Sequence, residues 1–422
     1  MSFEQGTERS MMIERPTTIV PEGIAAFATQ GHGTRSHPAL SRRTRICFPF
    51  AGGLIGGSHV SALKLVQSLD SIEFEPIVLL HSLEGPLRDF VEREGIRFEL
   101  APPVHVWRPG DRVAARELAR YVPDMLRMRA YLKARDIRIV HTNEGPMHAT
   151  WALPARLAGA RHIWHHRGHP RARGLRVQAP LLASRVLCVS NYAAPEPGLW
   201  SARRKASAVY SPFDTSIAGI DREAARAALQ SRLGIGPETA VLAFLGHFSE
   251  RKRPLVFVET IAALRQRRPD LRLIAPMFGE EFEPGIEARL RALIDELGVN
   301  DLVRIMGFVQ PVEPWLAASD ALVVPAVEEP FGRTLVEAML VGTPVVAAAS
   351  GGNLEAIRHR GNGLLARADD PADLAAHVLE LIDRPELAAT IAHRARQEAL
   401  LKFSVGHHVK KVTAIYREVL AA

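Results

Sequence analysis

Short apolar runs rich in β-branched residues alternate along the chain with longer segments of helical periodicity. In the first half, a helical pattern places Val60, Leu63, Val66 and Leu69 at three-residue spacing after a glycine-rich turn. Such alternation is typical of βαβ units that build a parallel sheet. The first half is therefore predicted to have strands at 45–50, 76–80, 137–141, 161–165 and 186–190, with a long helix over 114–135.

The second half repeats this arrangement after a junction at 210–236. It is predicted to have strands at 240–246, 272–277, 303–307, 321–325 and 344–348, and helices at 254–267, 286–297, 334–341 and 373–383. The pattern predicts an α/β protein with two tandem Rossmann-like, doubly wound domains that face each other across a cleft. Ligands of such domains bind at the carboxyl ends of the strands. No repeat of 20–50 residues is present.

The 422 residues suffice for two domains with large cores. Residues 1–43 mix Gly, Ser, Thr, Pro and Arg without periodicity, which indicates a flexible N-terminal leader. The first domain is expected over 44–210 and the second over 211–403. Residues 404–422 have a helical pattern and could pack on either domain, including back on the N-terminal domain.

Hydrophobic residues make up 47% of the chain and charged residues 23%, as in soluble globular proteins. No run of about 18 apolar residues and no signal-peptide pattern occurs. Cys47 and Cys188 both lie in apolar runs, which favours buried thiols over a disulfide and a reducing compartment. We therefore expect a cytoplasmic protein.

The net charge of +7 is unevenly distributed. Residues 1–210 contain 29 Lys and Arg against 18 Asp and Glu, and residues 151–210 alone contain 10 basic residues and one acid, Glu196. Such a field attracts phosphates, anionic lipid surfaces or nucleic acid. Nucleic acid is disfavoured, because the basic stretch has no zinc-ligand spacing, RNP-like aromatic motif or heptad repeat. Phosphate ligands and peripheral contact with an anionic membrane, at the inner membrane face, both stay open.

The most specific motif follows the predicted strand 321–325 and leads into a helix near Thr334. A loop that enters a helix N-terminus presents free N–H groups and suits a diphosphate. Glu329 and Glu337 would flank that anion site and accept hydrogen bonds from sugar hydroxyls. Thr334 and Glu337 also have capping-box spacing, so Glu337 has an equally good structural interpretation. Glu329 precedes a proline in a loop and has no such alternative role.

The segment 329–347 resembles the E-x7-E signature of family 4 glycosyltransferases, and the glycines at 351–352 and 361–363 follow as in that family. The resemblance extends over about 240–383. It implies the two-domain GT-B fold, a donor-binding second domain, an acceptor-side first domain and retention of anomeric configuration. It also implies that Glu329 contacts the transferred sugar and Glu337 the nucleotide ribose. The amides expected to face the sugar and diphosphate belong to Phe331, Gly332, Arg333, Thr334 and Leu335.

A basic loop at 246–254 joins another predicted strand to its helix. It resembles the family's G-R-L-x-x-x-K element, with Lys252 at the lysine position. Lysine suits a leaving diphosphate, on which negative charge grows. His247 stands at the arginine position and is mostly neutral at pH 7. We therefore expect Arg251 or Arg253 to supply the missing charge, or phosphate binding to be weaker.

The glycine-rich turn of the first half has neither dinucleotide nor P-loop spacing. Gly56 and Gly57 match the family's glycine pair beneath the donor phosphates and the acceptor. The histidines near 163–169 lack partners at metal-ligand spacing. By the resemblance, His165, with His166 next in line, would hydrogen-bond the transferred sugar or the acceptor. Asn143 occupies the place of a second family histidine.

These observations predict a retaining glycosyltransferase that takes a nucleotide-diphosphate sugar and acts in polysaccharide or glycolipid assembly. Its catalytic residues would be Glu329, His165 and Lys252, and the nucleobase is expected near Phe308. No Asp-x-Asp triplet occurs, so we expect no metal and no cofactor. The acceptor would be a sugar or a lipid-linked sugar. The basic stretch 161–176 is expected either to dock a lipid-linked pyrophosphate sugar at the inner membrane face or to guide a soluble anionic acceptor. A nucleotide-sugar epimerase, an inverting transferase and a non-catalytic nucleotide-sugar-binding protein are the alternatives.

Overall fold

The computed structural model describes residues 43–422 except residue 54 and residues 108–114, so the predicted leader over 1–43 lies outside the described residues but for Arg43. In its N-terminal lobe, parallel strands form a seven-stranded sheet of order β3-β2-β1-β4-β5-β6-β7. The strands are β1 (Thr44–Phe50), β2 (Phe74–Leu80), β3 (Phe98–Leu100), β4 (Ile137–Thr142), β5 (Arg161–His166), β6 (Arg185–Cys188) and β7 (Ala206–Ala208). The helices among them are α1 (Gly57–Ser68), α2 (Pro86–Arg93), α3 (Ala115–Ala134), α4 (Gly145–Ala158) and α5 (Arg173–Leu182).

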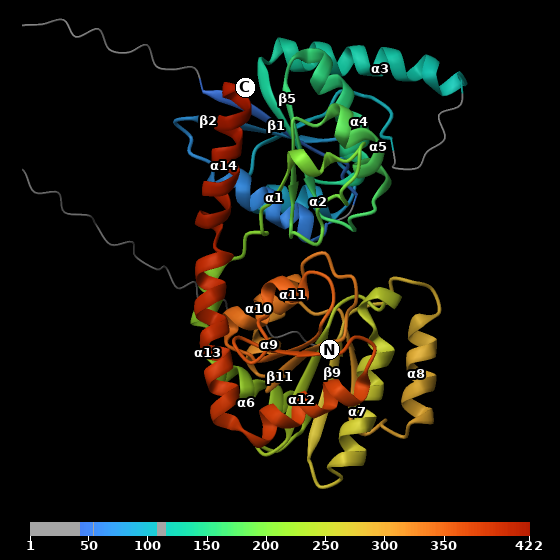
Figure 1. Ribbon diagram of the computed structural model, residues 1–422, viewed down its shortest axis with the longest axis vertical. Helices are drawn as coiled ribbons and strands as arrows, with labels where there is room; N and C mark the ends of the chain where they lie inside the picture. Colours follow the sequence, from blue (N-terminus) through green and yellow to red (C-terminus); the bar gives the residue numbers. More distant parts are fainter. Residues whose placement is uncertain (1–42, 54, 108–114) are drawn as a thin grey trace, which may run out of the picture. The chain divides into compact units, whose positions relative to one another are not determined.

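Helices cover both faces of this sheet because its strands are apolar on both sides. Along β1, Ile46 and Phe48 pack with α1 and α2, whereas Cys47 between them packs with α3 and α4 on the opposite face. Figure 1 shows these two helical layers around the N-terminal sheet. Both cysteines, Cys47 and Cys188, are buried and free, as the sequence indicates. Burial raises the pKa of each thiol.

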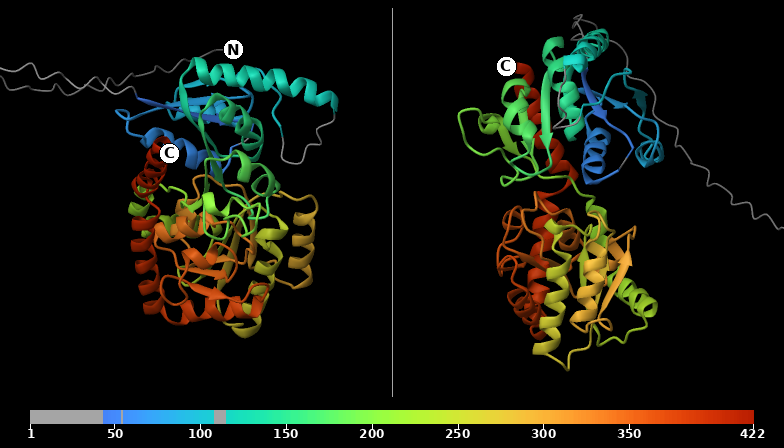
Figure 2. Two further views of the ribbon diagram at one scale, coloured as in Figure 1. Left: turned by 45° about the horizontal axis from the view of Figure 1, so that its top comes forward. Right: turned by 90° about the vertical axis from the view of Figure 1, so that its right-hand side faces the viewer.

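The C-terminal lobe has a six-stranded parallel sheet of order β10-β9-β8-β11-β12-β13, again among the described residues. Its strands are β8 (Ala240–Leu245), β9 (Leu273–Phe278), β10 (Val303–Gly307), β11 (Ala321–Val324), β12 (Val345–Ala348) and β13 (Leu364–Ala366). Its helices are α6 (Arg222–Leu233), α7 (Pro254–Arg267), α8 (Ile286–Glu296), α9 (Glu313–Ala317), α10 (Arg333–Val341), α11 (Asn353–Ala356), α12 (Pro371–Asp383) and α13 (Pro385–Lys402). The views in Figure 2 show helices on both faces of this sheet as well.

The last helix, α14 (Val405–Ala421), leaves the C-terminal lobe and packs on the N-terminal lobe (Figure 1). Ser404 caps it by accepting a hydrogen bond from the His407 amide. Val412, Tyr416 and Val419 are buried in the same core as β1 and α1. The first strand and the last helix of the described residues therefore belong to one lobe.

The predicted α/β class with two doubly wound domains is confirmed. The 18-residue helix α13 was not predicted, and neither were the short strands β3, β7 and β13, whose three residues are too few to show a period. No helix in the described part of the chain has the length and apolarity needed to cross a bilayer.

Candidate functional site

The order of the strands reverses between β1 and β4 in one sheet and between β8 and β11 in the other. Loops that follow such switch-point strands form the usual ligand site of a doubly wound sheet. Here they line a cavity of about 940 Å³, within the size range of ligand pockets. From the N-terminal lobe its lining includes Gly57, Ser58, Asn143, Glu144, His148, His166, Arg167 and Arg173. From the C-terminal lobe it includes His247, Arg251, Lys252, Phe308, Glu313, Glu329, Phe331, Gly332, Arg333, Thr334 and Glu337.

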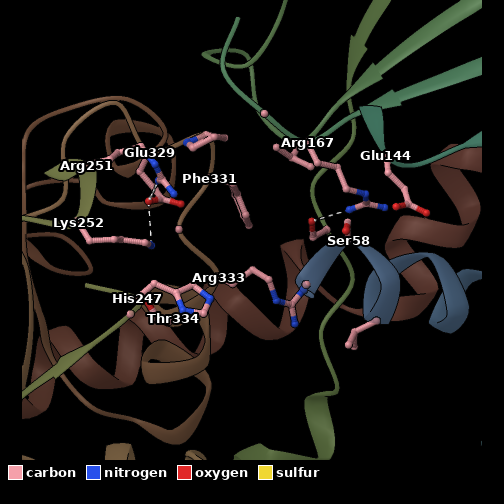
Figure 3. A pocket seen from close by; sticks show the side chains of 18 of the residues that line it. Ser58, Glu144, Arg167, His247, Arg251, Lys252, Glu329, Phe331, Arg333 and Thr334 are labelled. Atoms are coloured by element: carbon pink, nitrogen blue, oxygen red, sulfur yellow. Dashed lines mark hydrogen bonds and ion pairs between the residues drawn. The ribbon is translucent and has the colours of Figure 1, made fainter. Parts of the chain in front are cut away.

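Glu329 forms the centre of a charged cluster on the C-terminal side of the pocket (Figure 3). Its side chain is 10% exposed, and its Oε2 lies 2.9 Å from Lys252 Nζ and accepts a hydrogen bond from Arg251. Burial acts to raise the pKa of Glu329, but Lys252 and Arg251 outweigh it and hold the pKa below its usual value. The carboxylate is therefore ionised at neutral pH and holds both cations at the pocket.

Two consecutive glycines hold the loop that carries Glu329. Gly352 donates its backbone N–H to the Glu329 carbonyl oxygen at 2.7 Å. A Cβ on Gly352 would lie 2.6 Å from the Pro330 carbonyl oxygen, and one on Gly351 would lie 2.6 Å from that of Glu329. These distances are too short for a side chain at either position. The glycine pair thus lets two loops pack backbone to backbone and sets the position of Glu329.

The capping-box interpretation of Glu337 is wrong. The helix α10 begins at Arg333, and its N-cap residue is Gly332, with φ at +81° and no side-chain cap. Thr334 is consequently already inside the helix, and Glu337 lies one turn further on, with its carboxylate 3.3 Å from Arg333 Nη2. Burial raises the pKa of Glu337, and Arg333 only partly opposes this. Glu337 therefore lines the pocket without a capping role.

The three cations of the basic loop have different orientations. Arg251 and Lys252 line the pocket, while Arg253 ion-pairs with Asp369 at 2.7 Å outside the lining. His247 lines the pocket too, and its exposed ring lies 5.6 Å from the ring of Phe282. Of the two arginines expected to replace the charge missing at His247, Arg251 is thus the one at the pocket.

Arg333 links the two lobes beside this site. Its Nη1 donates to Ser61 Oγ of α1 at 3.0 Å, and its guanidinium lies 4.3 Å from the centre of the Phe213 ring. The side chain also occupies the space above Gly57, where a Cβ would approach it to 2.6 Å. A side chain at position 57 would therefore displace the Arg333 side chain from this position.

Several predicted residues lie away from the pocket lining. Gly56 is the N-cap of α1 and precedes the lining residue Gly57. The Leu335 side chain is fully buried in the core of the C-terminal lobe. His165 is likewise fully buried, with its Nδ1 3.1 Å from His141 Nε2, and its ring stacks on that of His408. Side chains alternate along β5, so His165 faces α14 while its neighbour His166 lines the pocket.

His166 is held by its own loop. Its Nε2 lies 2.9 Å from the His169 carbonyl oxygen, and burial lowers its pKa to about 4. The imidazole is therefore neutral at pH 7, so Nε2 donates this hydrogen bond and Nδ1 is left as an acceptor. Of the two histidines considered at the end of β5, His166 is therefore the one that lines the pocket.

Sequence reasoning did not single out a carboxylate and a guanidinium on the N-terminal side, Glu144 and Arg167, although Arg167 lies in the basic stretch 161–176. Glu144 Oε1 accepts the Ala51 N–H at 2.9 Å, and its Oε2 lies 3.4 Å from His59 Nε2. Glu144 lies in the loop that follows the switch-point strand β4, and Arg167 follows the neighbouring strand β5. That position at the carboxyl end of a strand is the signal that could have identified them.

Solved structures similar to this chain have the same two-lobe GT-B architecture. HepE of Anabaena, crystallised with UDP and glucose, matches with a TM-score of 0.74 and 21% identity over 89% of this chain and 100% of that one. A glycosyltransferase from Rickettsia africae matches with a TM-score of 0.74 and 17% identity over 90% and 99% of the two chains. At these identities the likeness establishes the fold, which is GT-B.

Sequence comparison describes the C-terminal lobe further. Residues 226–398 match the family of glycosyl transferases group 1, so this lobe carries a group 1 glycosyltransferase domain. The D-inositol 3-phosphate glycosyltransferase of Thermobispora bispora is 35% identical over 212 residues, 48% of each chain. That of Salinispora arenicola is 37% identical over 217 residues, 49% of this chain and 47% of the relative. The chain thus spans about half the length of the curated relatives it matches.

Proposed function

We propose that the chain is a retaining glycosyltransferase that moves a sugar from a nucleotide-diphosphate sugar to an acceptor hydroxyl in polysaccharide or glycolipid assembly. The observation that carries this proposal is the cluster of Glu329, Arg251 and Lys252 beside the first turn of α10. Two cations and free helix N–H groups suit a diphosphate, and an adjacent carboxylate suits sugar hydroxyls. The cluster lies inside the group 1 domain.

Each residue of the cluster has a defined role in this scheme. Lys252 and Arg251 neutralise the charge that grows on the departing diphosphate, in a site already shaped to receive it. Glu329 keeps both cations in position before the donor arrives. Once the donor has bound and Lys252 and Arg251 pair with its phosphates, Glu329 accepts hydrogen bonds from the transferred sugar. Glu337, one turn into α10, accepts hydrogen bonds from the ribose.

The stereochemistry follows from the carboxylates available to the sugar. A double displacement needs a free carboxylate beneath the anomeric carbon. Glu144 is the N-terminal-lobe carboxylate in the lining, and it is already engaged by Ala51 and His59. We therefore propose attack by the acceptor hydroxyl on the face that the diphosphate leaves. The donor would bind without a metal, since lysine and arginine supply the positive charge and the sequence has no Asp-x-Asp triplet.

The test uses a thermal-shift screen against UDP, GDP and ADP sugars, because a ligand that binds only the folded state raises its apparent stability. Turnover of the selected donor is then compared between the wild type, Glu329→Gln and Glu328→Gln, all with EDTA present. Glu328 is the matched control, since it is adjacent, 63% exposed in its side chain and outside the lining.

We expect Glu329→Gln to lose transfer and Glu328→Gln to retain it. Equal turnover in the two variants would contradict the site, and absence of binding by every nucleotide sugar would contradict the function. Product analysis with donor alone separates an epimerase from a transferase. Retention or inversion is read from the anomeric configuration of the product.

We further propose that the enzyme works in the cytoplasm at the inner membrane face, through a basic–aromatic surface on the N-terminal lobe. This surface consists of Arg173, Arg176, Val177, Leu181, Leu199 and Trp200. Leu199 is fully exposed and Trp200 is 72% exposed, and two aliphatic residues of α5, Val177 and Leu181, are exposed as well. Lys205 connects the two segments by donating to the carbonyl oxygens of Pro180 and Ala183. Apolar side chains among arginines suit an anionic bilayer surface.

Vesicle cosedimentation tests this surface. Wild type should bind phosphatidylglycerol vesicles more strongly than phosphatidylcholine vesicles, and high salt should reduce this preference. Trp200→Ser should weaken binding to the anionic vesicles. The matched control is Phe282→Ser, which removes another exposed aromatic residue, 70% exposed, from the C-terminal lobe. Equal binding by both variants would exclude the surface.

A further inference from the structure

Arg167 is a cation in the pocket that no carboxylate neutralises. Its Nη1 donates to Ser211 Oγ at 3.1 Å, and its Nη2 donates to Asn143 Oδ1 at 3.2 Å and lies 3.4 Å from His165 Nδ1. Its Nε is buried and has no hydrogen-bond partner. Within the described residues, no ion pair of Arg167 with an Asp or Glu occurs at 4.0 Å or less. The hydrogen-bond partners of the guanidinium are all neutral.

Such an arrangement is unfavourable without a ligand. Burial, reinforced by the nearby charge of Arg333, lowers the pKa of Arg167 to about 9, so the side chain is still charged at neutral pH. An uncompensated buried charge costs folding free energy unless an anion joins it. The other cations deep in this pocket each have a carboxylate: Arg251 and Lys252 share Glu329, and Arg333 has Glu337.

The carboxylate nearest in Figure 3, that of Glu144, does not fill this role. One of its oxygens accepts the Ala51 N–H, and the other faces His59. What adjoins Arg167 is favourable to an anion instead. Ser58 lines the same pocket in the first turn of the twelve-residue helix α1, a turn without acidic residues. Helix N–H groups and a hydroxyl complement a guanidinium in binding phosphate or carboxylate.

The two cationic sites lie on different sides of the pocket. Figure 3 shows Arg167 and Ser58 on one side and Arg251, Lys252 and Glu329 on the other. If the second group binds the donor diphosphate, as proposed above, then Arg167 is left for a different anion. Its position in the N-terminal lobe, opposite the donor domain, places that anion on the acceptor.

We propose that Arg167 binds an anionic substituent, a phosphate or a carboxylate, on the sugar or polyol that accepts the transferred sugar. The guanidinium supplies a planar pair of donors that fits either group. The acceptor is thereby selected against its neutral analogues. The assignment to the acceptor rests on the proposed transferase function, whereas anion binding by Arg167 itself does not.

The test measures anion binding directly with the full chain. Thermal stability is followed during titration with inorganic phosphate, or with acetate as the carboxylate probe, against chloride at the same ionic strength. Each titration is run with and without the nucleoside diphosphate that the donor screen selects, because that ligand occupies the Arg251–Lys252 site. Variants are Arg167→Met, Arg167→Lys and the control Arg156→Met, which removes an exposed arginine of α4 outside the lining.

With the nucleotide bound, phosphate or acetate should raise the melting temperature of the wild type and of Arg156→Met, but not of Arg167→Met. Arg167→Lys should retain part of the rise, since it keeps the charge without the planar pair. A preference for one probe identifies the substituent. Without added anion, Arg167→Met should not lower the melting temperature, because the substitution removes an unpaired buried charge. If Arg167 were purely structural, the same substitution would lower the melting temperature.

The proposal is overturned if neither anion stabilises the wild type beyond chloride, or if Arg167→Met responds as the wild type does. It is also overturned if Arg167→Met unfolds at a lower temperature and Arg167→Lys restores stability without restoring the response. If no nucleotide binds, the transferase function fails, and the titrations without nucleotide still decide whether Arg167 binds an anion.

Discussion

The two sides of the pocket differ in whether a carboxylate neutralises their cations. On the C-terminal side, Arg251 and Lys252 lie against the buried carboxylate of Glu329, so the cations are held in place without a ligand. On the N-terminal side, Arg167 has only neutral hydrogen-bond partners. A paired cluster is preorganised and has to exchange partners when its ligand arrives. An unpaired guanidinium depends on its ligand for compensation.

The largest effect is expected from removal of a cation on the paired side. Lys252→Met should lower sugar transfer by about 10²–10³-fold, the usual loss when a group that stabilises transition-state charge is removed. Steady-state kinetics with the selected donor measure it. Arg253→Met is the matched control, since Arg253 pairs with Asp369 outside the lining and should change the rate little. Similar losses in both variants would mean that the basic loop acts only through its net charge.

Disturbing the loop that positions Glu329 should have the next largest effect. Gly352→Ala places a Cβ 2.6 Å from the Pro330 carbonyl oxygen and 2.7 Å from Phe331 Cα, and these backbone atoms have little freedom to move. We expect a loss of about 1–3 kcal/mol in the free energy of unfolding, together with reduced transfer. Urea denaturation checks the first and kinetics the second. Gly219→Ala, with nothing within 4 Å of the added Cβ, should be nearly neutral.

Glu337 should separate stability from binding. Its pKa is raised by burial, so its ionised form costs folding free energy at neutral pH, and Glu337→Gln should match or exceed the wild type in melting temperature. Nucleotide affinity should nevertheless fall about tenfold if the carboxylate binds the ribose. Calorimetric titration with the nucleotide measures this. A melting temperature well below that of the wild type would restore a structural role for Glu337.

The smallest effect is expected from acid. The folded-state pKa of Glu329 is below its usual value, so the cluster contributes stability above the unfolded-state pKa and loses it as the pH falls through the folded-state value. The free energy of unfolding of the wild type should therefore decline more steeply in that acidic range than that of Glu329→Gln. Denaturation curves at successive pH values provide the comparison. Parallel declines would show that Lys252 and Arg251 do not stabilise the ionised carboxylate.

The sequence by itself determined the α/β class and the two doubly wound halves, and it identified Lys252 and Glu329 as candidate residues of the cleft. Hydrophobic periodicity identifies strands and helices that are long enough to contain several repeats. The candidate residues around Lys252 and around Glu329 each lie within a few positions of one another, in a single strand–loop–helix segment. Their chemistry could therefore be seen before any contact was known. Short strands such as Leu364–Ala366 could not be predicted, because three residues are too few to show a period. The role of Glu337 could not be assigned either, because the spacing of Thr334 and Glu337 does not fix the residue at which the helix begins.

Only the tertiary structure determined which residues line the N-terminal side of the pocket and how they are paired. Whether His165 or His166 lines the cavity depends on which face of β5 packs against α14, a helix more than 200 positions later in the chain. Whether Arg167 has a counter-ion depends on loops from β4, β5 and β7 that meet in space alone. Charge compensation between distant segments is a property of the packed fold, and for this reason an unpaired arginine has no signature in the sequence.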